Sequence, residues 1–123
     1  MACILIVEDD GLVRDMLARR LTMAGYDTVH AEDGVRAIVA SLNARPDIIL
    51  MDMGLPILNG WQATQRIKNR AETSHIPIIA LTAYVLSEDR VRALNVGCDE
   101  FEPKPIDFDR LFAKIDRLLS TTV

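Results

Sequence analysis

Three short apolar runs constrain the fold of this chain more than any other sequence feature. They are Ile4–Val7, Ile48–Met51 and Ile76–Leu81, and within each run apolar residues follow one another without alternating with polar ones. Strands that are covered on both faces have this pattern, whereas strands with one solvated face alternate. The runs therefore predict a parallel sheet with helices packed on both of its faces.

Two weaker runs, residues 28–31 and 100–102, complete a set of five expected strands. Apolar residues recur at helical spacing between the strands, which predicts five helices. The expected buried faces are Leu12, Met16, Leu17 and Leu21 in the first helix, Val35, Ile38, Val39 and Leu42 in the second, and Phe108, Leu111, Phe112, Ile115 and Leu119 in the last. The expected N-caps are Asp33, Asn59, Ser87 and Asp107, and the expected stops are Gly25 and Gly97.

This alternation of strands and helices predicts an α/β fold with a doubly wound, five-stranded parallel sheet and five helices. Because crossovers between parallel strands are right-handed, the flavodoxin-like strand order 2-1-3-4-5 is one standard solution. The length of 123 residues suits a single domain spanning 1–123. The fifth strand is then an edge strand, which tolerates Pro103 because a proline cannot donate to the ladder.

Charge and hydropathy narrow the classes of partner. The net charge of −4 disfavours direct binding of nucleic acid, because phosphate recognition needs a basic face. No apolar run approaches the roughly 20 residues of a membrane-spanning helix, so we expect no membrane insertion. The N-terminus has no basic segment before its first apolar run, and a cytoplasmic protein is therefore expected.

The two cysteines, Cys3 and Cys98, do not form a metal-binding pattern with the two histidines, because no pair has ligand spacing. We expect two reduced and mostly buried thiols. The predicted strand order places about three strand spacings, roughly 14 Å, between them. That distance is too long for a disulfide.

In open α/β sheets ligands bind beyond the carboxyl ends of the strands, so the residues directly after the expected strands are candidates for a site. These residues are Glu8, Asp9 and Asp10 after the first strand, Asp52 after the third, Thr82 and Ala83 after the fourth, and Lys104 after the fifth. Singly, each has an ordinary role as a helix cap, a turn residue or a solvated charge. Their position after strands of one sheet favours a common site instead.

The carboxylates of Glu8, Asp9 and Asp52 would converge at this site, and packing them without a counter-ion would raise at least one pKa. Mg²⁺ prefers oxygen ligands and would relieve the repulsion. Lys104 adds a positive charge and Thr82 a hydroxyl, which completes a set typical of phosphoryl transfer. A carboxylate can itself accept a phosphoryl group as an aspartyl-phosphate.

The motifs that contain these residues are Val7-Glu8-Asp9-Asp10, Leu50-Met51-Asp52-Met53-Gly54-Leu55-Pro56, Asn59-Gly60, Leu81-Thr82-Ala83 and Lys104-Pro105. Together they resemble, over the whole chain, the signature of response-regulator receiver domains of two-component signalling, including the single-domain chemotaxis regulators. The resemblance implies that Asp52 is the phosphoacceptor. It implies that Mg²⁺ is bound directly by Asp9 and Asp52, through water by Glu8, and by the backbone carbonyl of Gly54.

The resemblance also implies how the switch works. Thr82, Lys104 and the backbone N–H of Ala83 would hold the phosphoryl oxygens. Phe101 occupies the aromatic switch position, from which it would turn inward; the open alternative is a plain core phenylalanine on an edge strand. A histidine kinase or a phosphotransfer domain would be the donor. A downstream protein target would bind the surface of the fourth helix, fifth strand and fifth helix. In relatives the Lys104-Pro105 bond is cis.

Two further predictions concern docking and phosphate lifetime. Val13 follows the acidic run at the start of the first helix, and we expect it to be exposed and to contact the donor helices. Gly54 and Tyr84 stand at the positions that gate hydrolysis in the family. Because Gly54 has no side chain to orient a water and Tyr84 is bulky, the sequence predicts a long-lived phosphoprotein.

Several alternatives remain open. The chain is either a stand-alone receiver or the receiver part of a hybrid histidine kinase or longer response regulator. An aspartate-nucleophile phosphohydrolase would place an acid where this chain has Gly54, so no enzyme activity is expected beyond the domain's own phosphorylation and dephosphorylation. A flavin site would need a phosphate-cradling loop where Glu8 to Asp10 are acidic. The last alternative is a non-phosphorylated interaction module of the same fold. Such a module would not need the complete set of site residues that this chain has.

Overall fold

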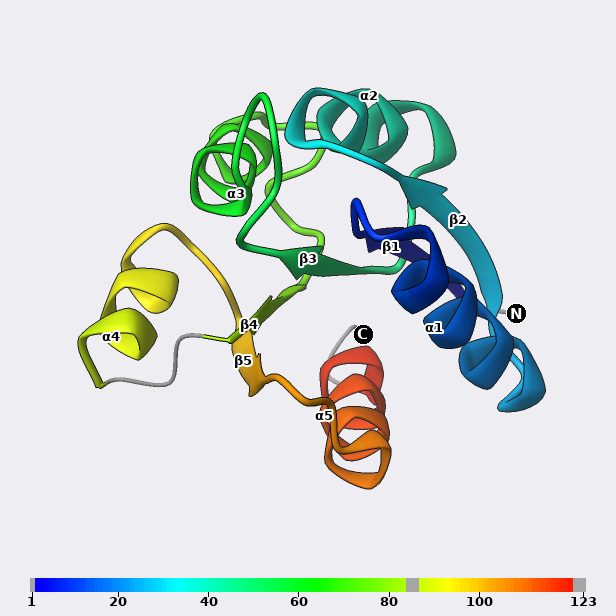
Figure 1. Ribbon diagram of the computed structural model, residues 1–123. Helices are drawn as coiled ribbons and strands as arrows, with labels where there is room; N and C mark the ends of the chain where they lie inside the picture. Colours follow the sequence, from blue (N-terminus) through cyan, green and yellow to red (C-terminus); the bar gives the residue numbers. More distant parts are fainter. Residues whose placement is uncertain (1, 84–86, 121–123) are drawn as a thin grey trace.

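The computed structural model describes residues 2–83 and 87–120. These residues form five strands that alternate with five helices (Figure 1). The strands are β1 (Cys3–Val7), β2 (Asp27–Ala31), β3 (Ile48–Asp52), β4 (Ile78–Thr82) and β5 (Glu100–Pro103). The helices are α1 (Gly11–Met23), α2 (Gly34–Ala44), α3 (Gly60–Lys68), α4 (Ser87–Asn95) and α5 (Phe108–Ser120).

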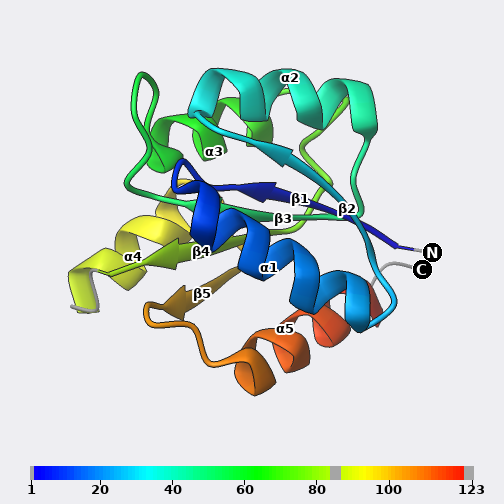
Figure 2. The same cartoon turned by 45° about the vertical axis from the view of Figure 1, so that its right-hand side comes forward.

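All five strands belong to one parallel sheet with the order β2-β1-β3-β4-β5. Helices α1 and α5 cover one face, and α2, α3 and α4 cover the other (Figure 1, Figure 2). The predicted doubly wound fold and its strand order are confirmed. Pro103 lies at the end of the edge strand β5, as predicted, and the Lys104-Pro105 bond is cis.

The continuous apolar runs are explained by two separate cores. In β3, Ile48 and Leu50 pack with α1 and α5, whereas Ile49 and Met51 pack with α2, α3 and α4. Every residue of β3 and of β4 is buried. An alternating polar pattern would therefore have placed polar side chains in one of the two cores.

Polar side chains and glycines set the helix boundaries largely as predicted. Asp33 accepts from the Arg36 N–H at 2.8 Å to cap α2, and Asp107 accepts from the Arg110 N–H at 3.1 Å to cap α5. Gly25 and Gly97 follow α1 and α4 with φ values of +97° and +105°, which favour glycine. The capping role predicted for Ser87 concerns a side chain outside the described part of the structure.

The predicted buried faces of α1 and α2 are wrong in part. Leu12 is 83% exposed and Met16 46%, although both were expected in the core. The core-facing residues of α1 are Leu17 and Leu21, with Val13 and Ala18 packed beside them. The apolar side chains of this helix cover more of its circumference than the sheet can cover.

Helix α2 approaches the sheet through small residues instead of its large apolar ones. Its buried residues are Gly34, Ala37 and Ser41. Val35 and Val39 are 48% and 50% exposed on the flank of the helix, which corrects their predicted burial. Small side chains allow a close approach of the helix to the sheet, and the two valines are left at the surface.

Both cysteines are free. Cys98 is buried as predicted, whereas Cys3 is only partly buried at the start of β1. None of the described helices combines the length and the apolar character that a membrane crossing requires.

Candidate functional site

The carboxyl ends of β1 and β3 lie side by side. Val7 of β1 pairs in register with Met51 of β3, so that Glu8 and Asp52, the next residue in each case, reach the same edge. Glu8 and Asp52 are 1% and 6% exposed, whereas Asp9 is exposed. Ligand oxygens of Glu8, Asp9 and Asp52 all lie within 4.8 Å of one another. The structure thus brings together the three carboxylates that the sequence predicts as metal ligands.

Lys104 supplies the positive charge that faces these carboxylates. Its Nζ lies 3.1 Å from Oε1 of Glu8 and 3.3 Å from Oδ1 of Asp52. The backbone N–H of Lys104 donates to the carbonyl of Thr82 at 2.8 Å. Lys104 therefore connects the ends of β1, β3 and β4 through its side chain and its backbone.

The Lys104 ammonium pairs with two carboxylates, Glu8 and Asp52, and Asp9 lies close to both of them. Burial and this excess of negative charge together shift the pKa values of the site. The pKa of Glu8 is raised to about 7, first by burial and then by the adjacent Asp52, while Lys104 acts in the opposite direction. Burial alone would lower the pKa of Lys104, but Asp52 and Glu8 outweigh it and the net shift is upward. A divalent cation with oxygen ligands would relieve the excess of negative charge, so this donor set fits Mg²⁺.

Two glycines lie next to Asp52, and one of them, Gly60, is required there for steric reasons. The N–H of Gly54 donates to Oδ1 of Asp52 at 3.1 Å and so orients the carboxylate. A Cβ on Gly60 would lie 2.3 Å from the backbone carbonyl oxygen of Asp52, so a larger residue would displace the start of α3. Asn59 caps this helix in a capping box with Gln62. The Asn59-Gly60 motif therefore seats α3 directly against the phosphoacceptor predicted from the sequence.

Thr82 ends β4 beside this site. Leu81 of β4 pairs in register with Asp52, and the Met53 N–H donates to the Leu81 carbonyl at 3.0 Å. Thr82 is 2% exposed, whereas Ala83 is exposed. Both residues lie at the same edge of the sheet as Asp52.

Comparison with known proteins agrees with this geometry. Residues 4–116 match the sequence model of the response regulator receiver domain. The chain belongs to this family.

Similar proteins include both long and short relatives of this receiver domain. It is 34% identical to the DNA-binding dual master transcriptional regulator RpaA of Synechocystis sp. over 99% of its own length and 51% of that protein. It is also 34% identical to the polar-differentiation response regulator DivK of Brucella anthropi, over 94% of each chain. The domain thus spans about half the length of RpaA and nearly all of DivK.

A solved structure of similar fold holds a metal. The receiver domain of a sensor histidine kinase from Pseudomonas aeruginosa, crystallised with magnesium in its active-site cleft, superposes with a TM-score of 0.90. The two sequences are 33% identical, and the comparison covers 98% of each chain. The receiver domain described here has an acidic cluster that could hold such an ion.

The predicted switch residue, Phe101, is buried in this receiver domain. It is 5% exposed and packs in the core that α3 and α4 share, with the Arg90 guanidinium 5.6 Å from the centre of its ring. The outward starting position implied by the predicted inward turn is therefore not observed. The predicted lifetime residue Tyr84 lies outside the described residues.

The predicted docking residue, Val13, is not the exposed member of its pair. Val13 is partly buried against the α1 and α5 core, and its neighbour Leu12 is the exposed one. The cap explains this orientation, because Oδ1 of Asp10 accepts from the N–H groups of Leu12 and Val13 at 2.9 and 3.3 Å and fixes the first turn. Val13 instead lines a groove of about 380 Å³ whose other residues are Met16, Lys104, Pro105, Ile106 and Phe108.

Arg14 belongs to the site although none of the sequence motifs contains it. Its Nη1 donates to the backbone carbonyl of Glu8 at 2.9 Å, which holds the acidic loop against α1. Its Nε is buried and has no hydrogen-bond partner among the described residues. The only sequence signal is its place one turn after Asp10, and an arginine in the first turns of a helix is too common to indicate a site.

Proposed function

We propose that this receiver domain is the phosphoacceptor switch of a two-component or phosphorelay system, and that Asp52 is its phosphoacceptor. A histidine kinase or a phosphotransfer domain would be the donor, and Mg²⁺ the cofactor. The observation that supports this most is the convergence of three carboxylates and the Lys104 ammonium at one edge of the sheet. Phosphoryl transfer depends on such a combination of metal, cation and positioned acceptor.

In the proposed transfer, a carboxylate oxygen of Asp52 attacks the donor phosphorus. The bond between phosphorus and the donor imidazole nitrogen breaks, its electron pair stays on that nitrogen, and an aspartyl-phosphate forms. Lys104 would then pair with the phosphoryl oxygens. Asp9, Asp52, the Gly54 carbonyl and, through water, Glu8 would bind Mg²⁺, which supplies positive charge at the same oxygens.

The switch would follow from contacts that only the phosphorylated state makes. The Thr82 hydroxyl and the Ala83 N–H would donate to the phosphoryl oxygens and draw the end of β4 toward Asp52. The side chain of Phe101, on β5, packs against α4, so its surroundings would change with that movement. Only a group that binds one state better can shift the population, and these two donors are such groups. The output surface would be α4, β5 and α5, which would bind a downstream protein.

Donor docking would use the groove that Val13 lines. The groove is apolar, and Lys104 of the phosphorylation site is one of its lining residues. A donor helix packed there would bring its phosphohistidine close to Asp52. Burial of apolar surface would supply the affinity, and the groove's position would supply the orientation.

We further propose that residues 1–123 form one domain of a cytoplasmic protein. The single sheet to which all described strands belong supports this. The domain would catalyse only its own phosphorylation and dephosphorylation, because Gly54 offers no acid for turnover of external phosphoesters. The net charge of −4 favours protein partners over direct nucleic-acid binding.

A second candidate function is that of a receiver unit within a longer protein. The match to about half of RpaA, and the likeness to the receiver domain of a histidine kinase, favour it. The chemistry at Asp52 would be the same in both cases. The output would differ, because a receiver in a longer chain acts on its neighbouring domains.

Phosphorylation by a small donor tests the proposal. The domain would be incubated with acetyl phosphate and Mg²⁺, and intact mass would report the gain of one phosphoryl group. We expect Asp52→Asn to remain unlabelled and chelation of Mg²⁺ to abolish labelling of the parent. Asp109→Asn, a change of an exposed carboxylate on α5, is the matched control and should label fully. Equal labelling of Asp52→Asn and the parent would overturn the assignment.

A further inference from the structure

A groove between α2 and α3 is a surface feature that the phosphorylation site does not use. The two helices lie side by side over the same face of the sheet (Figure 1, Figure 2). The groove has a volume of about 350 Å³. Its lining residues are Val35, Ile38, Val39, Arg66, Asn69 and Arg70.

One wall of this α2–α3 groove is apolar and accessible. Val35 and Val39 are about half exposed and stand four residues apart, which places them on the same side of α2. Ile38, partly buried against the core, continues this strip inward. The outer flank of a surface helix is ordinarily polar, so a contiguous apolar strip indicates contact with a partner.

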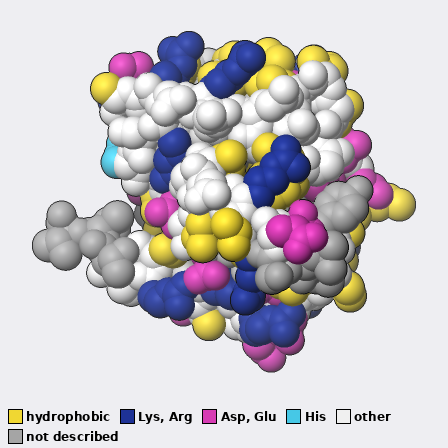
Figure 3. Space-filling view, turned by 90° about the vertical axis from the view of Figure 1, so that its left-hand side faces the viewer, with side chains coloured by type: hydrophobic (Ala, Val, Ile, Leu, Met, Phe, Trp, Pro, Cys, Tyr) yellow, Lys and Arg dark blue, Asp and Glu magenta, His cyan; other side chains and the backbone are white. Residues whose placement is uncertain are grey.

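The other wall carries positive charge. Arg66 lies in the last turn of α3, and Arg70 follows four residues later. Neither guanidinium forms an ion pair within residues 2–83 and 87–120, and no carboxylate lines the groove. Figure 3 shows Lys and Arg side chains near hydrophobic ones in the upper part of the view, the half of the molecule in which α3 lies. The C-terminal dipole of α3 accounts for a cation in its last turn, but it does not account for the exposed valines opposite.

We propose that this α2–α3 groove docks an acidic amphipathic helix of a partner protein. The apolar side of that helix would cover Val35, Ile38 and Val39, and its carboxylates would pair with Arg66 and Arg70. A groove between two helices with apolar anchors four residues apart fits recognition of a helix. Charge complementarity selects an acidic one, in a domain whose own net charge is −4.

Two other occupants fit less well. A second copy of the domain, docked symmetrically through this groove, would bring the arginines of both copies together, because a two-fold interface apposes the same patch. Nucleic acid would need a broader basic face than two arginines beside an apolar strip.

The proposal goes beyond the phosphorylation switch and does not depend on it. Helices α2 and α3 begin at Gly34 and Gly60, which pack tightly against Leu58 and Asp52 respectively. The groove therefore lies on two firmly seated helices, and it shares no lining residue with the site at Asp52. A partner bound there would tether the domain whether or not Asp52 is phosphorylated.

The test uses two synthetic helical peptides of about 14 residues, roughly four turns each, with leucines on one side and glutamates on the other. The two peptides differ in the sequence positions at which the leucines are placed. Each is titrated into the ¹⁵N-labelled full chain and followed by NMR. We expect shifts centred on residues 35–39 and 66–70, and a Kd on the order of 10 to 100 μM that weakens with added salt.

Matched charge reversals locate the binding. Arg66→Glu/Arg70→Glu should weaken binding at least about tenfold, because it replaces attraction by repulsion. Arg19→Glu/Arg45→Glu makes the same charge change on exposed residues outside the groove and should leave the Kd within about twofold, since surface charges at a distance are screened. Both double variants should accept a phosphoryl group from acetyl phosphate as the parent does, so this test does not depend on the outcome at Asp52.

Four results would overturn the proposal. The first is the absence of shifts at 35–39 and 66–70 with both peptides. The second is equal weakening by the two double variants, and the third is equally tight binding of peptides with lysine in place of glutamate. The fourth is a peptide-independent dimer in sedimentation that Val39→Asp dissociates, which would assign the groove to a second copy.

Discussion

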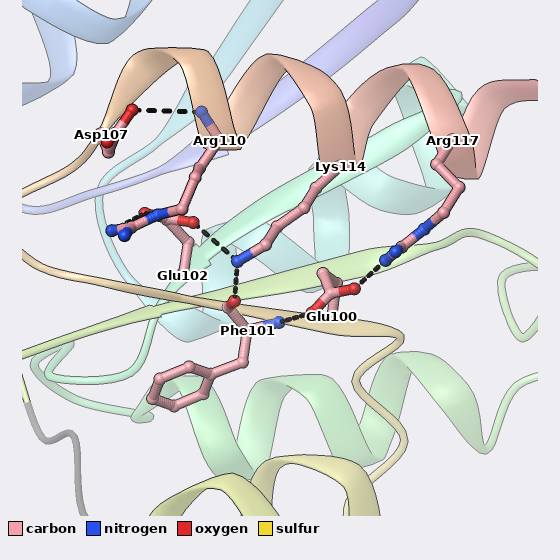
Figure 4. Close-up of polar contacts among 7 residues, drawn as sticks. All are labelled: Glu100, Phe101, Glu102, Asp107, Arg110, Lys114 and Arg117. Carbon is pink, nitrogen blue, oxygen red and sulfur yellow. Dashed lines mark hydrogen bonds and ion pairs between the residues drawn. The ribbon is translucent and has the colours of Figure 1, made fainter.

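Lys114 Nζ lies 2.7 Å from Oε1 of Glu102, a carboxylate with no exposed surface. Arg110 Nη2 lies 3.1 Å from the other oxygen, and Lys114 also donates to the backbone carbonyl of Phe101 at 2.5 Å (Figure 4). Burial of a carboxylate is costly unless cations pair with it, and here two cations on α5 do so. This network fastens α5 to the edge strand that carries Phe101.

Removal of one partner from this network should destabilise the fold. Lys114→Met leaves Glu102 buried with only Arg110, and we expect a loss of about 3 kcal/mol in the free energy of unfolding. The double variant Glu102→Leu/Lys114→Met removes both charges and should recover most of that loss. Urea unfolding measures both values.

The exposed pair between Arg117 and Glu100 is the control for this prediction (Figure 4). The Arg117 side chain is 60% exposed, so Arg117→Ala should cost less than about 1 kcal/mol. Two results would show that burial of Glu102 does not govern the energetics. One is an equal loss of unfolding free energy in Lys114→Met and Arg117→Ala, and the other is no recovery of stability in the double variant.

Substitutions in the Val13 groove should separate kinase docking from chemistry. Met16→Glu places a charge on the apolar wall at a residue that is 46% exposed, so its effect on folding should be small. We expect slower transfer from the best donor in a panel of histidine kinases and unchanged labelling by acetyl phosphate. Val13→Glu should act in the same direction, with an added cost in stability because Val13 is partly buried.

Leu12→Glu is the matched control for docking, because Leu12 is exposed but does not line this groove. Its transfer rate should change less than that of Met16→Glu. If acetyl phosphate labelling falls as much as kinase transfer, the substitution has damaged the fold or the site, and docking through the groove is not supported.

Cys98 should make stability fall at alkaline pH. Burial raises the pKa of its thiol from 9.0 to about 11, a difference worth about 3 kcal/mol. Since the folded pKa is above the unfolded one, this stabilisation is complete below pH 9 and is lost as the pH rises through 11. The free energy of unfolding of the parent should therefore fall relative to that of Cys98→Ala between pH 9 and pH 11. A constant difference between the two proteins across that range would contradict the prediction.

The sequence predicted the architecture because burial on both faces leaves a direct pattern. The runs at Ile48–Met51 and Ile76–Leu81 have no polar residue, and no other common sheet arrangement requires that. Helix orientation was less predictable. In α1, Leu12, Val13, Met16 and Leu17 are all apolar, so periodicity alone does not say which of them face the sheet.

The acidic site was predictable because its residues lie at the ends of the strands or directly after them. Glu8, Asp52 and Lys104 gain their proximity from strand order alone. The contacts of Arg14 and of Glu102 were not predictable, since each depends on how a helix packs against one strand. Glu102 precedes Pro103 on an edge strand, and nothing in the sequence indicates that its side chain is buried.

The lifetime of the aspartyl-phosphate depends on how water reaches Asp52. The N–H of Gly54 contacts Oδ1 of Asp52, and a Cβ at this position would lie 3.8 Å from the same oxygen, in ordinary contact. A side chain would therefore fit here and reach the site, yet glycine offers none to orient the attacking water. We predict a long-lived phosphoprotein for this reason.

The double variant Gly54→Asn/Tyr84→Glu should lose its phosphoryl group faster than the parent. Because the family resemblance makes 54 and 84 the positions that gate hydrolysis, an amide and a carboxylate there are expected to position water. One well-placed interaction of about 1.4 kcal/mol accelerates hydrolysis roughly tenfold. Decay of the label after removal of acetyl phosphate gives both rates, and Gly54→Ala is the control that adds bulk without a polar group. Acceleration in Gly54→Ala equal to that in the double variant would mean that backbone disturbance, and not a positioned water, sets the rate. Decay of the parent within seconds would contradict the predicted long lifetime itself.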